Sequence, residues 1–164
     1  MKVKNLLLVI CAIFIEFLRD YCFININLYI EYLENLGNGF EVFNHTDSLM
    51  LLILGNFKLK TLIIIKWILS LVFCIAFFEL GILFSKFNFD LESHKKFLKP
   101  YTLGGLILLL TSLIIYLIGK FLTIENEFNF YFVSLEISHL VQSSLYPISF
   151  ILIFWSYNLR ISSS

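Results

Sequence analysis

The chain has 164 residues, of which 59% are hydrophobic and only 15% are charged, and its 12 basic and 12 acidic side chains cancel. Soluble domains are roughly 45–50% apolar and about 25% charged, so a water-soluble chain of this kind would expose large apolar patches. Basic residues do not outnumber acidic ones, which argues against nucleic acid as a partner. The composition predicts an integral membrane protein, with the lipid bilayer as its first partner.

Four stretches are long and apolar enough, or nearly so, to cross the hydrocarbon as helices, which takes about 20 residues. They cover residues 5–24, 61–84, 101–119 and 130–157. We therefore expect an all-α membrane protein: a bundle of four transmembrane helices in a single integral membrane domain, 1–164.

The first stretch has a second interpretation as a cleaved signal peptide. Lys2 and Lys4 precede the apolar run Leu6–Ile15, as in a secretory signal. No small-x-small cleavage site follows, and Ile10 is too large for the residue before a lipidated cysteine. A retained helix is the better interpretation.

The long loop over residues 25–60 also carries apolar residues at helical spacing. Leu28, Ile30, Leu33 and Leu36 recur before the Gly37–Gly39 break, and Ser48 can cap the run Leu49–Leu54. This pattern predicts one or two short amphipathic helices, lying on the membrane or on the bundle.

The basic residues predict the orientation. With the N-terminus inside, the inner side holds Lys2, Lys4, Lys86, Lys95, Lys96, Lys99 and Arg160. The outer side holds Lys58 and Lys60, with Arg19 and Lys120 near the interface. The outer loops are otherwise acidic and contain Glu31, Glu34, Glu41, Asp47, Glu125 and Glu127. The positive-inside rule therefore places both termini in the cytoplasm, in what the Ile-, Lys- and Asn-rich composition suggests is a bacterial inner membrane.

Ionisable residues inside apolar stretches are candidates for function because burying a charge in hydrocarbon is costly. Glu79 is one such intramembrane acid: it either reaches the inner interface beside Lys86 or has a partner inside the bundle. Glu136, His139, Ser143 and Pro147 fall on one helical stripe, with Gln142 beside it. That stripe predicts either interhelical hydrogen bonding with a kink at Pro147 or a polar pocket.

Glu16, Arg19 and Asp20 form a second polar group, at the outer end of the first helix. Under the predicted topology Glu136, His139 and Gln142 lie near the same face, so the two groups are expected to share an outward-facing polar site. A structural or docking role is favoured over a catalytic one, and no catalytic residue is assigned. A single Glu-x-x-His pair does not complete a metal site, and neither a metal nor a cofactor is expected.

Two further features concern packing. Gly105, Ser112 and Gly119 recur at heptad spacing in the third helix, which predicts close helix–helix approach. The three cysteines, Cys11, Cys22 and Cys74, form no Cys-x-x-Cys motif and are expected to be free thiols that pack as small apolar groups.

Two segments resemble a known family. Phe17–Asn27 and Val141–Leu145 are similar to segments of the exosortase F system-associated proteins, small membrane proteins of Bacteroidota. In that family an Arg-Asp pair with aromatic and Asn residues closes the first helix. Ser144 stands where the family pattern has Pro, and Glu136 where a basic residue is usual. The resemblance implies an accessory to protein sorting or surface export, and it supplies no catalytic residues.

The leading hypothesis is a non-enzymatic accessory protein that binds another membrane protein or a second copy of itself. Two alternatives remain open. One is a membrane enzyme with Glu136 and His139 as an acid–base pair. The other is a small oligomeric channel or proton path through Glu79 and Glu136.

Overall fold

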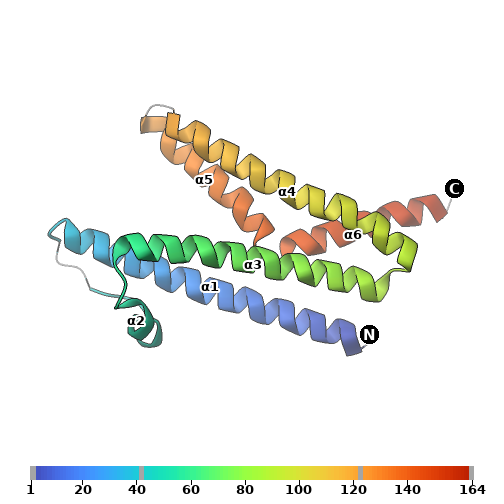
Figure 1. The fold of residues 1–164 in the computed structure, drawn as a ribbon, viewed down its shortest axis with the longest axis horizontal. Coiled ribbons are helices and arrows are strands. Elements are labelled where there is room, and N and C mark those ends of the chain that lie inside the picture. Colours follow the sequence, from blue (N-terminus) through green and yellow to red (C-terminus); the bar gives the residue numbers. More distant parts are fainter. Residues whose placement is uncertain (1–2, 41–42, 122–123, 163–164) are drawn as a thin grey trace. The chain divides into compact units, whose positions relative to one another are not determined.

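The computed structural model describes residues 3–40, 43–121 and 124–162. These residues form six helices and no strand, which confirms the all-α class (Figure 1). The helices are α1 (Val3–Gly37), α2 (Ser48–Leu54), α3 (Leu59–Asn88), α4 (Leu91–Phe121), α5 (Ile124–Val141) and α6 (Leu145–Ser162).

Helix α1 runs well past the span expected over residues 5–24, and it ends where the glycines predict a break. Gly39 has a φ of +80°, a conformation that glycine adopts without strain. The Gly39 N–H bonds to the Leu36 carbonyl, and the Phe40 N–H bonds to the Asn35 carbonyl, both at 3.1 Å. These are the two hydrogen bonds of a Schellman motif, which satisfies carbonyls left free at a helix end.

Helix α2 begins at Ser48, one residue earlier than a cap at Ser48 would allow. The capping residue is Asp47 and not Ser48, because the Asp47 carboxylate accepts the Leu49 N–H at 2.9 Å. A carboxylate in this position satisfies one of the free amides of the first helical turn.

The helix predicted over residues 130–157 is divided into α5 and α6, which meet at a bend of 65°. Pro147 has no N–H to give to the Ser143 carbonyl, and its ring crowds that carbonyl. The carbonyl instead accepts the Tyr146 N–H at 3.4 Å. The proline therefore interrupts the helix upstream of its own position, at residues 142–144.

Among the described residues, α3 and α4 are long and apolar enough to cross a membrane. The bent pair Phe132–Val141 and Leu145–Tyr157 adds a third candidate if the two segments form one span. The predicted bundle of four spans is not confirmed, because α1 carries Glu16, Arg19 and Asp20 near its middle.

The chain forms two compact units. The small unit is Phe14–Phe73, and the large unit comprises Met1–Ile13 and Cys74–Ser164. Each is described separately below.

The small unit packs α2 against the second half of α1 and the start of α3. Its buried core consists of Ile26, Tyr29, Met50, Leu54 and Leu62. Met50 and Leu54 lie one turn apart on α2, so one face of this short helix supplies both contacts. The segment that follows α1 is therefore attached to the helices on either side of it.

The large unit is built around an aromatic cluster. Phe97, Tyr101 and Tyr146 are almost fully buried. Phe78 lies against both tyrosines, with ring centroids 5.3 Å away in each case. The Tyr101 hydroxyl donates to the Phe77 carbonyl at 3.2 Å, and the Tyr146 hydroxyl donates to the Tyr101 carbonyl. Both tyrosine hydroxyls inside the cluster therefore have backbone hydrogen-bond acceptors.

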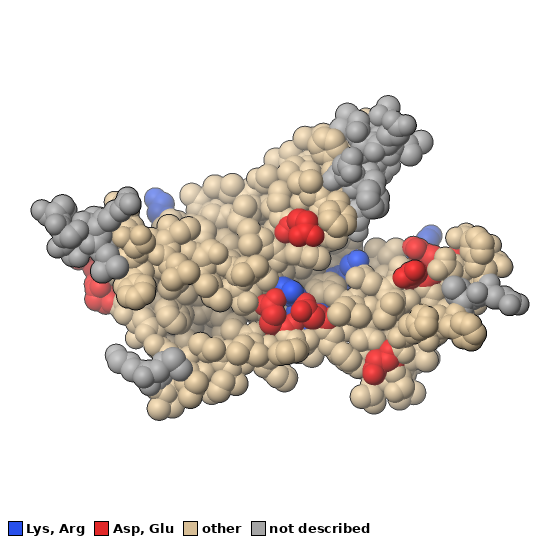
Figure 2. Space-filling model, turned by 180° about the vertical axis from the view of Figure 1, so that it is seen from behind, with Lys and Arg blue, Asp and Glu red and all other residues tan. Residues whose placement is uncertain are grey.

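The surface is mostly apolar. Large hydrophobic side chains are exposed along α1, α3, α4 and α6, for example Phe17 (73%), Leu71 (62%) and Ile153 (66%). On the face drawn in Figure 2, charged side chains are few and lie in small groups with uncharged surface between the groups. Such a surface fits a lipid environment.

Gly105 provides a test of the aromatic cluster. A Cβ at this position would collide with the Phe78 ring, and Tyr101 and Tyr146 restrict the movement of that ring. We expect Gly105→Ala to destabilise the large unit by about 1–3 kcal/mol, measured as thermal unfolding in detergent micelles.

Gly37→Ala is the matched control for this substitution. A Cβ on Gly37 meets nothing within 4 Å, so this variant should be no less stable than the unchanged chain. Equal stability of the two variants would contradict the packing of Phe78 on Gly105.

Candidate functional site

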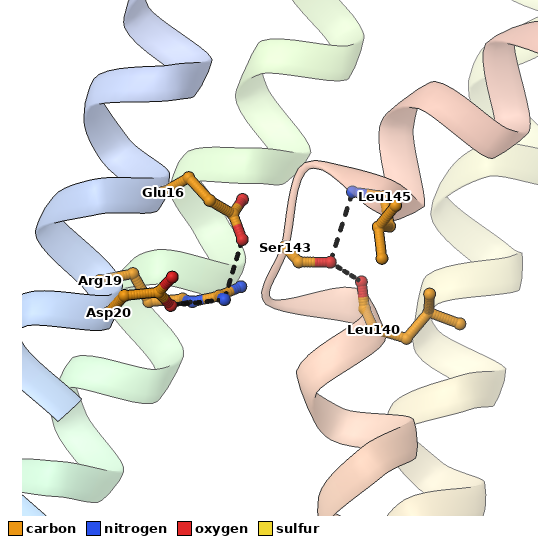
Figure 3. A network of polar contacts seen from close by, with 6 residues as sticks. All are labelled: Glu16, Arg19, Asp20, Leu140, Ser143 and Leu145. Carbon is orange, nitrogen blue, oxygen red and sulfur yellow. Dashed lines mark hydrogen bonds and ion pairs between the residues drawn. The ribbon is translucent and has the colours of Figure 1, made fainter. Parts of the chain in front are cut away.

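Arg19 is held between two carboxylates of its own helix. Its guanidinium lies 2.8 Å from Glu16 and 2.7 Å from Asp20, and its side chain is 17% exposed (Figure 3). Glu16 is one helical turn away, at the spacing that lets side chains meet. The pairing reduces the cost of placing these charges on a helix whose other exposed residues are largely apolar.

The other predicted polar residues lie at the end of α5 and in the break that follows it. Glu136 and His139 are exposed, whereas Gln142 and Ser143 are buried, at 6% and 5% exposure. The Ser143 hydroxyl donates to the Leu140 carbonyl at 2.9 Å and accepts the Leu145 N–H at 3.3 Å (Figure 3). Ser143 thus closes α5 and caps α6 with one hydroxyl.

These two groups belong to different units: Glu16, Arg19 and Asp20 to the small unit, and Glu136, His139, Gln142 and Ser143 to the large unit. A polar site shared by the two groups therefore remains a prediction. Because the helix is interrupted at residues 142–144, the continuous stripe from Glu136 to Pro147 is not present as one helical face.

The small unit contains a hydrogen-bond network that the sequence pattern did not reveal. Asn25 is 5% exposed; its amide donates to the Tyr21 carbonyl at 2.9 Å, and its carbonyl accepts the Asp47 N–H at 2.7 Å. The Tyr21 hydroxyl donates to the Asp47 carboxylate at 2.8 Å. Two residues of α1 therefore hold Asp47, which in turn caps α2.

A signal for this network was present in the sequence. Asn25 stands in an otherwise apolar stretch, four residues after Tyr21, and a buried amide needs partners. Asp47 directly precedes an apolar run, as helix caps do. What the sequence could not supply was the pairing across 22 residues that brings Asn25 to Asp47.

The hydrogen bonds of this network change the pKa of the Asp47 carboxyl group. The Tyr21 hydroxyl and the Leu49 N–H both donate to its carboxylate and lower its pKa below the ordinary value. The charged form is therefore the one that the folded small unit stabilises.

Glu79 lies on an exposed face of α3. Ile75 and Leu83, one turn before and one turn after it, are 62% and 36% exposed. Within the described part of the chain Glu79 forms no hydrogen bond or ion pair, and Lys86 lies seven residues away, about 10 Å along the helix axis. An acid therefore stands in a continuous apolar face of a candidate span.

The small residues of α4 are buried, with Gly105 against the Phe78 ring of α3 and Ser112 against α5. Gly105, Ser112 and Gly119 are all buried. The Ser112 hydroxyl donates to the Ser134 carbonyl at 2.8 Å, and the Ser134 hydroxyl donates to the Ser112 carbonyl at 2.9 Å. This reciprocal pair joins the two helices by hydrogen bonds that need no water.

Within residues 3–40, 43–121 and 124–162, no three His, Cys, Asp or Glu side chains are grouped so that they could hold a metal ion. Comparison with protein-family models, curated proteins and solved structures found no match.

The Tyr21–Asp47 contact predicts a pH effect. Because the folded-state pKa of Asp47 is lowered, its contribution to stability is complete above the unfolded value, about pH 4, and is lost as the pH falls through the lower folded value. In Tyr21→Phe the pKa should rise towards the ordinary value, and the loss should begin at higher pH. Carboxyl NMR titration of Asp47 measures this shift.

Thr46→Val is the control for this experiment. The Thr46 hydroxyl oxygen is buried and has no hydrogen-bond partner in the described structure, so its removal should leave the Asp47 titration unchanged. If the Tyr21→Phe titration coincided with that of the unchanged chain, the hydroxyl would not be the group that lowers the pKa.

Proposed function

We propose that this chain is a non-enzymatic accessory protein of the bacterial inner membrane that acts by binding another membrane protein. The observation that carries the proposal is Glu79, an exposed acid in the apolar face of α3. Other features described above are consistent with a binding role and require no reaction.

The position of Glu79 is costly unless something covers it. An acidic residue within a transmembrane helix costs a few kcal/mol on insertion scales, and such residues commonly face a protein partner or a water-filled cavity. Residues 75–83 of α3 present Glu79 between exposed apolar neighbours. A second membrane protein that supplies a cation or a hydrogen-bond donor would satisfy the carboxylate and cover the adjoining apolar surface.

The exposed placement of Glu136 and His139 gives an acid–base mechanism little support. A general acid–base pair works best where water is excluded and substrate is held. Both side chains are exposed at the end of α5. The exposure of these two side chains therefore supports a binding role better than a catalytic one.

The family resemblance supports a class of partner. The similar segment Phe17–Asn27 includes the Arg19 ion pairs and the Asn25 network, and the similar segment Val141–Leu145 is the break between α5 and α6. Both segments thus carry specific polar contacts rather than general hydrophobicity. An exosortase-type sorting or surface-export system is the proposed setting.

The proposed topology has four spans, with α1 as the first and the pair α5–α6 as the last. Both termini then lie in the cytoplasm, in agreement with the distribution of Lys and Arg. Under this arrangement Glu79 lies within the inner half of the bilayer.

Capture of a tagged chain from its native membranes tests the proposal. Glu79→Leu should remove the captured partner from the complex, because loss of one side of a desolvated charge pair costs roughly 2–5 kcal/mol, or about 30-fold or more in affinity. Glu79→Gln keeps a hydrogen-bonding group and should retain part of the binding. Quantitative mass spectrometry gives the amount of partner captured by each variant relative to the unchanged chain.

Glu92→Leu is the control, because Glu92 is also an exposed acid but lies in the first turn of α4, in an ion pair with Lys96. It should capture as much partner as the unchanged chain. A Glu79→Leu protein that folds and still captures the same partner in full, or an unchanged chain recovered only as a monomer, would refute the proposal.

A further inference from the structure

Helix α2 has two apolar faces with different surroundings. Met50 and Leu54 face the core of the small unit and are 9% and 2% exposed. Leu49, Leu52 and Ile53 lie on the other side and are 67%, 76% and 60% exposed. Residues three and four positions apart share a helical face, so these three side chains form one apolar surface, which we call the outer face of α2.

The outer face plays no part in holding α2 in place. The helix is fixed by Asp47, whose N–H is bound by Asn25 and whose carboxylate is bound by Tyr21, and by the buried Met50 and Leu54. Three large aliphatic side chains therefore stay exposed without a structural reason within the small unit.

The position of α2 along the candidate span indicates what covers this face. Leu54 packs in the same buried cluster as Leu62, which lies in the first turn of α3. Helix α3 is a candidate membrane span that begins at Leu59. Helix α2 therefore lies beside the end of a span, at the level where hydrocarbon gives way to the headgroups, a zone of about 5–8 Å on each side of the bilayer.

Charge near α2 fits the same environment. Lys58 and Lys60 are exposed and stand at the junction between α2 and α3. Lysine side chains at span ends extend to the headgroup region, where they meet phosphate oxygens. An apolar helical face next to basic residues is the usual pattern of a helix lying in the plane of a membrane interface.

We propose that the outer face of α2 is embedded in the lipid interface, with Leu49, Leu52 and Ile53 among the upper acyl segments and Lys58 and Lys60 at the phosphates. The occupant of this surface is lipid rather than a protein. Asp47 and Asn25 then serve to hold α2 at the angle that presents this face to the bilayer. The inference is independent of the partner proposed for Glu79.

Tryptophan fluorescence tests the proposal. Trp67→Phe and Trp155→Phe remove both native tryptophans, and Leu52→Trp adds one on the outer face. In vesicles of phosphatidylcholine and phosphatidylglycerol, emission from this indole should be blue-shifted. Lipids brominated near the headgroup should remove most of its intensity, whereas aqueous iodide should have little effect.

His45→Trp in the same background is the control, because His45 is exposed in the segment before Asp47. Its emission should be quenched by iodide and not by brominated lipid. If the indole at position 52 behaved like this control, the face would be in water. If neither quencher reached it, protein would cover it. Either result would overturn the proposal.

A second measurement needs no substitution. The unchanged chain in the same vesicles is exposed to a phospholipid that carries a photoactivatable diazirine near the headgroup end of its acyl chain, and labelled peptides are mapped by mass spectrometry. Label on residues 49–53 supports the proposal. Label on α3 and α4 peptides, with none on residues 49–53, would overturn it.

Discussion

Most of the surface of this molecule is apolar, so its polar side chains need hydrogen-bond partners within the protein. Where water is excluded, an unpaired donor or acceptor costs free energy that no other contact recovers. The buried polar groups described above meet this constraint mainly with backbone partners. Asn25 bonds to one carbonyl and one amide, Ser112 and Ser134 exchange hydroxyl–carbonyl bonds, and the Tyr146 hydroxyl bonds to a carbonyl. These directional bonds fix positions that apolar packing alone would leave interchangeable.

Each unit combines one such directional element with one apolar cluster. In the small unit, Asn25 and Tyr21 determine where α2 begins, and the surrounding aliphatic core then holds it. In the large unit, Ser112 and Ser134 join α4 to α5, while the rings around Tyr101 join α3, α4 and α6. Membrane helices gain little from hydrophobic attraction to one another, so small residues and hydroxyls carry much of the specificity of their packing.

How much of the structure could be predicted from the sequence depends on how far apart in the chain the interacting residues lie. Helix ends were predictable where the determining residues are local, as at Gly39. The start of α2 was predicted to within one residue, because Asp47 and Ser48 are both good caps. The break before Pro147 was expected only as a kink, because the loss of a hydrogen bond is local but the size of a bend depends on packing. The pairing of Asn25 with Asp47 spans a long loop, and no periodicity encodes it. The relation between the Arg19 group and the Glu136 group is of the same long-range kind.

Two surfaces differ from their surroundings in opposite ways, and the difference bears on what each one binds. Glu79 is polar in an apolar face of a candidate span, so lipid is the environment least able to satisfy it, and a protein that brings a donor is a better occupant. The outer face of α2 is apolar beside a segment that carries Asp47, Lys58 and Lys60, so water is the environment least suited to it, and acyl chains need supply no donor. The mismatch between a side chain and its surroundings therefore supports both proposals, a protein partner at Glu79 and lipid at the outer face of α2.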